Sequence, residues 1–185
     1  TVRTERYRWP RQRPISNGLH TYSHSGVSFV FIDTDEGVTG IGIGSGASSS
    51  STSSSSASSS GLIERLSEDL IGEDPINVER LWHKLWVPKL VGRRGLSTRA
   101  ISSIDIALWD LRAKVTNLPL YKMLGGFRQS VPTYVAGGYY EEGKGLKELQ
   151  EELSGHVEAG AKAVKMKVGG VPIVEDVARV RAARE

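Results

Sequence analysis

The chain has 185 residues, of which 38% are hydrophobic and 24% are charged, and it has no cysteine. This composition is that of a soluble globular protein. It excludes a mostly disordered chain, a disulfide-stapled secreted domain and any cysteine-based metal or iron–sulfur site. No apolar run approaches the roughly 20 residues of a membrane-spanning helix, and no signal peptide is visible. We therefore expect a cytoplasmic protein with no membrane partner.

The net charge of +3 is small, and the one local basic cluster lies between Arg3 and Arg13. Such a cluster is consistent with a nucleic-acid patch or with a solvated strand edge. The charge elsewhere is scattered, which favours the strand edge, and we expect no nucleic-acid partner.

Residues 2–43 predict an antiparallel sheet. Apolar side chains alternate along 26–32 and again along 38–43, and the residues between them favour a turn. Residues 2–9 form a candidate third strand. The intervening residues 11–25 contain Pro14, Asn17 and Gly18 and predict a long loop, which is more often functional than a short one. The polar residues of this loop are candidates to contact a polar substrate if the loop folds over a site. They are Asn17, His20, Tyr22 and His24. A mobile polar loop is the alternative.

Two segments have an unusual composition. Residues 48–60 comprise eleven serines, one threonine and one alanine, so they have no apolar stripe to bury. We expect this run to be disordered or a placeholder, without packed helix and without a catalytic serine. The glycines between Gly40 and Gly46 predict a tight strand end rather than a phosphate loop, because no amphipathic helix follows them.

Helical periodicity follows the serine run. The strongest apolar stripe is that of residues 97–115, where Asp110 also precedes Lys114 by four residues, the favourable order for a helical ion pair. Shorter helices are predicted at 62–70 and 78–86, and a last helical turn at 120–124.

From residue 131 the pattern changes to strand, helix, strand and helix. These elements are predicted at 131–136, 146–157, 161–168 and 173–183. The alternation indicates parallel strands with covering helices. Two parallel strands cannot form a covered sheet, and a closed barrel of such units takes about 250 residues. We therefore expect the fold that begins here to be incomplete in this chain.

Lys165 and Lys167 are the candidate catalytic residues. Side chains alternate along a strand, so both lysines should share one face while Val164 and Met166 face helices. Two positive charges about 7 Å apart repel by about 2 kcal/mol at an effective dielectric near 20, which favours the neutral form of one amine. A neutral lysine at the carboxyl end of a strand can act as a general base. A pair of solvated edge lysines is the alternative, and it stays open from the pattern alone.

Three segments together resemble the mandelate racemase/muconate lactonizing enzyme branch of the enolase superfamily. They are Gly92 to Leu111 (GRRGLSTRAISSIDIALWDL), Leu118 to Gly126 (LPLYKMLGG) and Lys165-Met166-Lys167. Within that branch the sequence is most similar to acid-sugar dehydratases of the galactarate/talarate type. Ile43 stands where that branch often has an acidic residue, and the serine run replaces its usual helix-forming segment.

The resemblance implies an α+β N-terminal capping domain, residues 1–129, followed by the first two βα units of a TIM-type barrel, residues 130–185. It implies removal of the proton α to the carboxylate of a small-molecule substrate, with Lys167 as the base and Lys165 assisting it. The loop at about 15–25 would close over the site and help to select the substrate.

The same resemblance implies a Mg²⁺ ion that holds the substrate carboxylate, and a homo-oligomer. The family's metal ligands and opposite-face base lie beyond Glu185, so we expect no metal site in this chain and no activity from it alone. A racemase or epimerase of the same superfamily and a non-catalytic fragment are the alternative functions.

Overall fold

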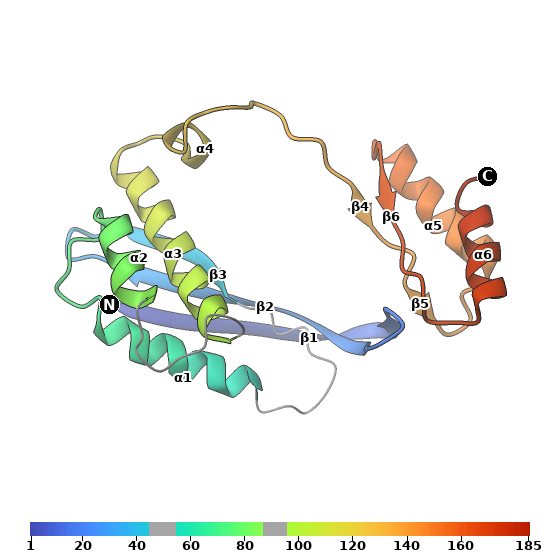
Figure 1. Ribbon diagram of the computed structural model, residues 1–185, viewed down its shortest axis with the longest axis horizontal. Helices are drawn as coiled ribbons and strands as arrows, with labels where there is room; N and C mark the ends of the chain where they lie inside the picture. Colours follow the sequence, from blue (N-terminus) through green and yellow to red (C-terminus); the bar gives the residue numbers. More distant parts are fainter. Residues whose placement is uncertain (45–54, 87–95) are drawn as a thin grey trace. The chain divides into compact units, whose positions relative to one another are not determined.

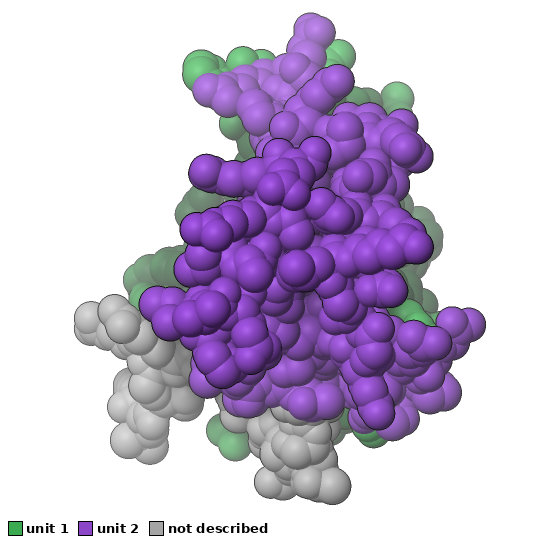
Figure 2. All heavy atoms as spheres, turned by 90° about the vertical axis from the view of Figure 1, so that its right-hand side faces the viewer, with its two compact units in different colours: residues 1–9, 26–127 green, residues 10–25, 128–185 purple. Residues whose placement is uncertain are grey.

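The computed structural model describes residues 1–44, 55–86 and 96–185 (Figure 1). The chain divides into two compact units, which Figure 2 colours separately. Unit 1 holds residues 1–9 and 26–127, and unit 2 holds residues 10–25 and 128–185. Residues 10–25, which the sequence placed in the N-terminal domain, thus group with the C-terminal residues. The domain boundary after Gln129 stays a prediction.

A four-stranded sheet has the order β3-β2-β1-β5. Its strands are β1 (Val2–Ser16), β2 (Thr21–Asp33), β3 (Thr39–Gly44) and β5 (Tyr140–Glu141). β2 and β3 are antiparallel, with Asp33 opposite Thr39, so the predicted turn between them is confirmed. Gly37 in this turn has φ +80°, a left-handed conformation that glycine adopts without strain. The short strand β5 was not predicted.

The predicted loop at 11–25 is wrong, because most of it belongs to the two long strands β1 and β2. Pro14 favoured a loop because proline has no N–H to donate to a ladder, and Pro10 lies in the same strand β1. Within the described residues β1 pairs with β5 only at Ile15 and Ser16, so most of its second edge is free. Two prolines four residues apart direct the missing N–H to the same side of a strand. An edge strand tolerates them when that side is the free one.

Four helices follow the sheet strands in unit 1: α1 (Ser55–Glu68), α2 (Val78–Trp86), α3 (Leu96–Val115) and α4 (Leu120–Met123). The predicted helices 78–86 and 97–115 and the turn at 120–124 are thereby confirmed. None of the helices in the described ranges is both long and apolar enough to cross a membrane.

The serine run is only partly described. Residues 48–54 lie outside the described residues. Residues 55–60 form the first turns of α1, so the expectation that this part lacks regular structure is wrong. Serine is only moderately unfavourable in a helix, and adding residues to an existing helix is easier than starting one. The amphipathic residues from Gly61 to Glu68 supply the helix that the serines extend.

α3 lies directly on β3, and two glycines make that approach possible. A Cβ on Gly40 would lie 2.2 Å from the Ala107 carbonyl oxygen, and a Cβ on Gly42 would lie 2.0 Å from the Ser103 carbonyl oxygen. Any side chain there would collide with the backbone of the helix. The glycine alternation is therefore a packing feature, as the sequence favoured, and not a phosphate loop.

The hydrophobic core of unit 1 lies between this sheet and the helices. Val30 and Ile32 of β2 meet α3 residues that the sequence predicted as its apolar stripe, namely Ile101, Ile104, Leu108 and Leu111. Leu81 and Leu85 of α2 are also buried in this cluster. Val115 is 46% exposed, so the predicted stripe ends one turn before the end of the helix.

A predicted ion pair fastens α3 to the edge strand. Lys114 Nζ lies 2.6 Å from Asp110 Oδ2, which confirms the pair expected from their spacing. The same carboxylate accepts the Ile41 amide of β3 at 2.8 Å, and Lys114 donates to the Thr39 carbonyl at 2.8 Å. The pair therefore occupies backbone groups of an edge strand that would otherwise be open to association.

Unit 2 alternates strands and helices as predicted. After β5 come α5 (Leu146–Glu158), β6 (Val164–Lys165) and α6 (Ile173–Ala182), and β4 (Val135–Ala136) precedes them. β4 and β6 are parallel, with Val135 opposite Val164 and Ala136 opposite Lys165. Regular pairing is shorter than the predicted strands 131–136 and 161–168.

The close contact of β3 with α3 yields a prediction for Gly42→Ala. We expect the added methyl group to lower the free energy of unfolding by about 3 kcal/mol, because backbone atoms of α3 cannot move aside as a flexible side chain would. Urea denaturation measures the change.

The matched control is Gly61→Ala in α1, where a Cβ would meet no described atom within 4 Å. We expect that substitution to stabilise the chain by up to about 1 kcal/mol, the usual gain from alanine in a helix. Equal effects of the two substitutions would contradict the packing role of Gly42.

Candidate functional site

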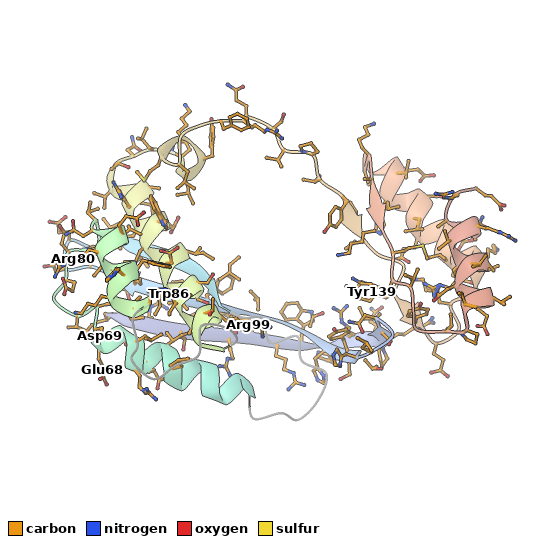
Figure 3. All side chains as sticks on the ribbon, in the orientation of Figure 1. Glu68, Asp69, Arg80, Trp86, Arg99 and Tyr139 are labelled. Atoms are coloured by element: carbon orange, nitrogen blue, oxygen red, sulfur yellow. The ribbon has the colours of Figure 1, made fainter. Side chains whose placement is uncertain are left out.

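The two predicted lysines each lie over a tyrosine ring of unit 2. Lys165 Nζ lies 5.4 Å from the ring centroid of Tyr134, and Lys167 Nζ lies 4.9 Å from that of Tyr139, which is labelled in Figure 3. Both distances are within the range of a cation–π interaction. Lys165 is opposite Ala136 in the parallel ladder, and Tyr134 precedes Ala136 by two residues. Tyr134, Ala136 and Lys165 thus share one face of the two strands.

The opposite face meets α5. A Cβ on Gly138 would lie 2.5 Å from Met166 Cβ and 3.4 Å from Leu149 Cδ1 of α5. A Cβ on Gly137 would lie 2.7 Å from Glu152 Oε1, also of α5. Met166 therefore lies beside the helix, and the lysines that alternate with it lie on the other face, as the sequence predicts.

The ladder is irregular at the point where Lys167 leaves the strand. The Lys165 carbonyl accepts the Gly137 amide at 2.9 Å, as in a regular parallel pair. The next bond runs from the Lys167 amide to the Gly138 carbonyl at 3.3 Å, one residue beyond the regular partner. Gly138 has φ +58°, which glycine permits. Lys167 is half-buried here, whereas Lys165 is exposed.

A tyrosine and an aspartate hold the loop that follows Lys167. The Tyr140 hydroxyl donates to Asp176 Oδ1 at 2.7 Å and accepts the Gly170 amide at 2.9 Å. The second carboxylate oxygen of Asp176 accepts the Gly169 amide at 2.6 Å. Two consecutive amides of a Gly-Gly loop are therefore bound by two side chains from different elements.

These contacts shift the pKa values of both partners. The hydrogen bond from Tyr140 and then that from the Gly169 amide hold the pKa of Asp176 below its usual value, and the nearby Arg179 acts in the same direction. Burial opposes this shift. Burial first, and then the bond to Asp176, raise the pKa of the Tyr140 hydroxyl above its usual value. The pair is thus a charged acceptor with a neutral donor.

Arg179 of α6 extends this arrangement. Its guanidinium lies 4.0 Å from the centroid of the Tyr140 ring and donates from Nη2 to the Gly138 carbonyl at 2.8 Å. Its Nε lies 3.8 Å from Asp176 Oδ1. The end of β4, the residue that begins β5 and the first turns of α6 are therefore connected through one arginine.

The predicted substrate loop is an ordered turn between β1 and β2. Asn17 Oδ1 accepts the amides of Leu19 at 3.0 Å and His20 at 2.8 Å, and its Nδ2 donates to the Tyr22 hydroxyl at 3.0 Å. The side-chain amide of Asn17 thus stabilises the turn through its oxygen, and its nitrogen binds Tyr22 to the turn. His20 is exposed, and His24 forms a 3.0 Å hydrogen bond with Ser23.

This turn lies against the loop after Lys167. A Cβ on Gly18 would lie 2.9 Å from the Gly170 Cα atom, and Ser16 is opposite Tyr140 in the ladder of β1 and β5. The structure therefore brings the turn that carries Asn17 and His20 next to a residue three positions after Lys167. The substrate-binding roles of Asn17, His20 and Tyr22 stay predictions.

Sequence reasoning missed the tyrosines and the aspartate of this site. One signal was available: aromatic residues flank the first Gly-Gly pair, with Tyr134 before it and Tyr139-Tyr140 directly after it. A second was Asp176, which follows the second Gly-Gly pair in the first turn of a helix, where carboxylates are favourable.

The family's magnesium does not fit the described residues. Residues 1–44, 55–86 and 96–185 contain no group of three or more histidine, aspartate or glutamate side chains that could hold a metal ion. Asp105 and Asp110 of α3 do not form such a group. Asp110 pairs with Lys114, and burial, followed by the charge of Glu79, raises the pKa of Asp105.

A cavity of about 650 Å³ in unit 1 is unrelated to the predicted site. It has an apolar floor that includes Ile32, Leu81 and Leu108, and its rim includes Asp35 and Glu36. None of the predicted site residues lines it.

The lowered pKa of Asp176 predicts a specific pH dependence for Asp176→Asn. Because the folded pKa lies below that of the unfolded chain, the carboxylate stabilises the folded state fully above about pH 5, and this contribution is lost as the pH falls below about 4. The difference in free energy of unfolding between wild type and variant should therefore be constant at neutral pH and shrink in acid. Urea denaturation over a pH series measures it, and a difference unchanged down to about pH 3 would contradict this ionisation.

The sequence profile of the family described as "Mandelate racemase / muconate lactonizing enzyme, N-terminal domain" matches residues 1–125. The arabinonate dehydratase of Saccharolobus solfataricus is 42% identical over 117 residues, which cover 63% of this chain and 31% of that protein. The 3,6-anhydro-alpha-L-galactonate cycloisomerase of Streptomyces coelicolor is 34% identical over 186 residues, which cover 100% of this chain and 50% of that protein.

Solved structures give the same result. A racemase from Streptomyces coelicolor A3(2) with bound magnesium has a TM-score of 0.86 and 31% identity, over 100% of this chain and 50% of that one. The L-talarate/galactarate dehydratase from Salmonella typhimurium LT2, liganded with Mg and L-lyxarohydroxamate, has a TM-score of 0.83 and 30% identity, over 99% of this chain and 47% of that one.

The chain spans about a third to a half of the length of these relatives. Most of it, residues 1–125, matches the family's N-terminal domain, and the described residues follow the fold of solved members. The chain therefore belongs to the mandelate racemase/muconate lactonizing enzyme family of the enolase superfamily.

Proposed function

We propose that this chain is the capping domain and the first two βα units of a barrel in an acid-sugar dehydratase, with Lys167 as a general base. The observation that carries the proposal is the position of Lys165 and Lys167. They share the face of the strands that is opposite α5, at the carboxyl end of β6, where the catalytic residues of βα barrels are found. The whole protein would be a homo-oligomer that binds a small carboxylate.

The chemistry asked of Lys167 is removal of a proton from the carbon next to a carboxylate. Its amine must be neutral to accept that proton. In a dehydratase the C–H bond breaks and its proton passes to Lys167. The C–O bond on the neighbouring carbon also breaks, and the hydroxyl group takes up a proton from the protonated lysine or from solvent and leaves as water. The resulting enol then becomes a keto acid.

The turn between β1 and β2 is the proposed substrate-selecting part. Gly18 lies against Gly170, so residues near Asn17 are close to the end of the strand that carries the base. A turn whose side chains already hold one another is rigid, and a rigid contact residue loses little entropy when it binds a substrate. His20, which is exposed, is the residue of this turn that is free to meet a polar ligand.

The only support for magnesium in this proposal comes from relatives of the chain. Two of the compared structures contain it, and the dehydratase holds it together with a sugar-acid analogue. The described residues of this chain offer no ligand cluster for it. We therefore propose that any metal is held by parts of the protein beyond residues 1–185, and we assign it no step here.

Two other functions remain as alternatives. The racemase and the cycloisomerase among the relatives make an isomerase a serious rival, because Lys167 would remove the same proton. A non-catalytic fragment is the second. Incubation of the full-length protein with acid sugars in deuterated water separates the first two, because a dehydratase forms a keto acid and a racemase incorporates deuterium into an epimer. The same incubation of the 185-residue chain tests the third, because a non-catalytic fragment does neither.

The proposed base predicts the effect of Lys167→Ala in the full-length protein. We expect turnover and exchange of the substrate α-proton with solvent to fall by on the order of 10² to 10⁴-fold, the usual contribution of a general base. Substrate binding should persist, because the turn contacts remain.

The matched control is Lys162→Ala, which removes an exposed lysine of the same unit just before β6. It should leave turnover unchanged. Full activity in the Lys167→Ala protein would rule out the base assignment.

The absence of a ligand cluster in the described residues predicts how the 185-residue chain responds to magnesium. We expect its midpoint of thermal unfolding to be the same with MgCl₂ and with an equal ionic strength of NaCl, because an ion stabilises a fold only if it binds the folded state. A rise specific to Mg²⁺ would show a site that the described residues lack. Turnover of an acid sugar by this chain alone would overturn the view that its site is incomplete.

A further inference from the structure

We propose that Tyr140 and Asp176 are positioning residues, which together hold Lys167 over Tyr139 and hold the β1–β2 turn beside it. The positions of these two residues follow from their contacts, and only their catalytic value rests on the proposed function. Neither residue needs to touch the substrate. Each acts through the Gly169-Gly170 loop that begins two residues after Lys167.

Two side chains bind the backbone of the Gly169-Gly170 loop. Glycine loses more conformational freedom on ordering than any other residue, so a Gly-Gly pair is mobile unless its backbone is bound. Here the Gly169 amide donates to Asp176 at 2.6 Å and the Gly170 amide donates to Tyr140 at 2.9 Å. The 2.7 Å bond between Tyr140 and Asp176 makes the two acceptors one unit.

Asp176 suits this task because it is buried and paired. It is 8% exposed, and the positive charge of Arg179, whose Nε lies 3.8 Å from Asp176 Oδ1, partly balances the charge of the carboxylate. Hydrogen bonds to an ionised acceptor are stronger than those between neutral groups. Removing the carboxylate would leave the Gly169 amide and the Tyr140 hydroxyl without their acceptor.

Tyr140 also fills the space between the loop and the turn. A Cβ on Gly170 would lie 2.5 Å from Tyr140 Cε2 and 2.8 Å from the Gly18 Cα atom. Gly170, although exposed, therefore lies against both the tyrosine ring and the β1–β2 turn. A shift of the ring must move the loop, the turn or both.

The backbone of Tyr140 contacts the same two segments. It is opposite Ser16 in the ladder of β1 and β5, and it follows Tyr139, whose ring lies under Lys167. One residue thus joins the turn, the glycine loop and the aromatic neighbour of the proposed base. Lys165 has no such connection, because its neighbour Tyr134 lies before the Gly-Gly pair.

Because Tyr140 is connected to Lys167 and not to Lys165, Lys165 serves as an internal control in the test. The ε-methylene protons of a lysine that sits over an aromatic ring are shifted upfield by the ring, so NMR of the 185-residue chain reports both lysine positions separately. In Tyr140→Phe, which keeps the ring and removes the hydroxyl, we expect the Lys167 signal to move toward the value of a free lysine. The Lys165 signal should stay in place.

Amide exchange measures the loop and the turn in the same sample. We expect exchange of the Gly169, Gly170 and Gly18 amides to become at least about tenfold faster in Tyr140→Phe, because the bound state of the loop opens more often. Asp176→Asn keeps one oxygen acceptor and loses the charge, so it should change the same signals in the same direction. Tyr121→Phe, on the exposed face of α4, is the matched control and should change none of them.

Two results would overturn the proposal. One is a Lys167 signal and glycine amides that stay as in the wild type in both variants. The other is loss of the Lys165 and Lys167 shifts together, which would mean that the pair supports unit 2 as a whole and does not position one lysine. The proposed function has a separate test: full activity after Lys167→Ala would refute the base while leaving a positioning result intact.

Discussion

Side-chain alternation along β6 is the constraint on which the candidate site depends. Met166 lies beside α5, because its Cβ and Leu149 of α5 would both contact a Cβ placed on Gly138. Once Met166 is fixed there, Lys165 and Lys167 have to lie on the other face. The lysine charges are then kept away from the apolar contact between β6 and α5. Lys165 lies over the ring of Tyr134, and Lys167 lies over that of Tyr139. A register shift of one residue would bury both lysines and expose Met166.

In two places within the described residues, glycines permit the close approach of backbones. In unit 1 the glycines of β3 let α3 lie on the sheet, because any side chain would meet carbonyl oxygens of the helix. In unit 2 Gly18 and Gly170 let a turn lie against a loop. The first contact is rigid because two regular elements meet. The second joins irregular segments, so it needs Tyr140 and Asp176 to hold it.

The sequence predicted those features whose physical cause is local. The helix α3 was found from its apolar stripe, the pair of Asp110 with Lys114 from its spacing, and the faces of β6 from period two. The prediction of a loop at 11–25 was wrong because proline was counted as a break in the strand, whereas an edge strand can direct a proline to its free side. The helical start of α1 was missed because serines have no apolar stripe, yet an existing helix can extend over them.

The site residues that the sequence missed have causes that are not local. Tyr140 and Asp176 are 36 positions apart and are joined only by the fold, so neither stands out by spacing. The lysines could be named beforehand because a single strand contains both. Their surroundings could not, since the rings of Tyr134 and Tyr139 come from the neighbouring strand and its end. A general base needs both parts: an amine at the right strand position, and neighbours that fix where its nitrogen points. This chain supplies the first through alternation and the second through contacts between distant segments of unit 2.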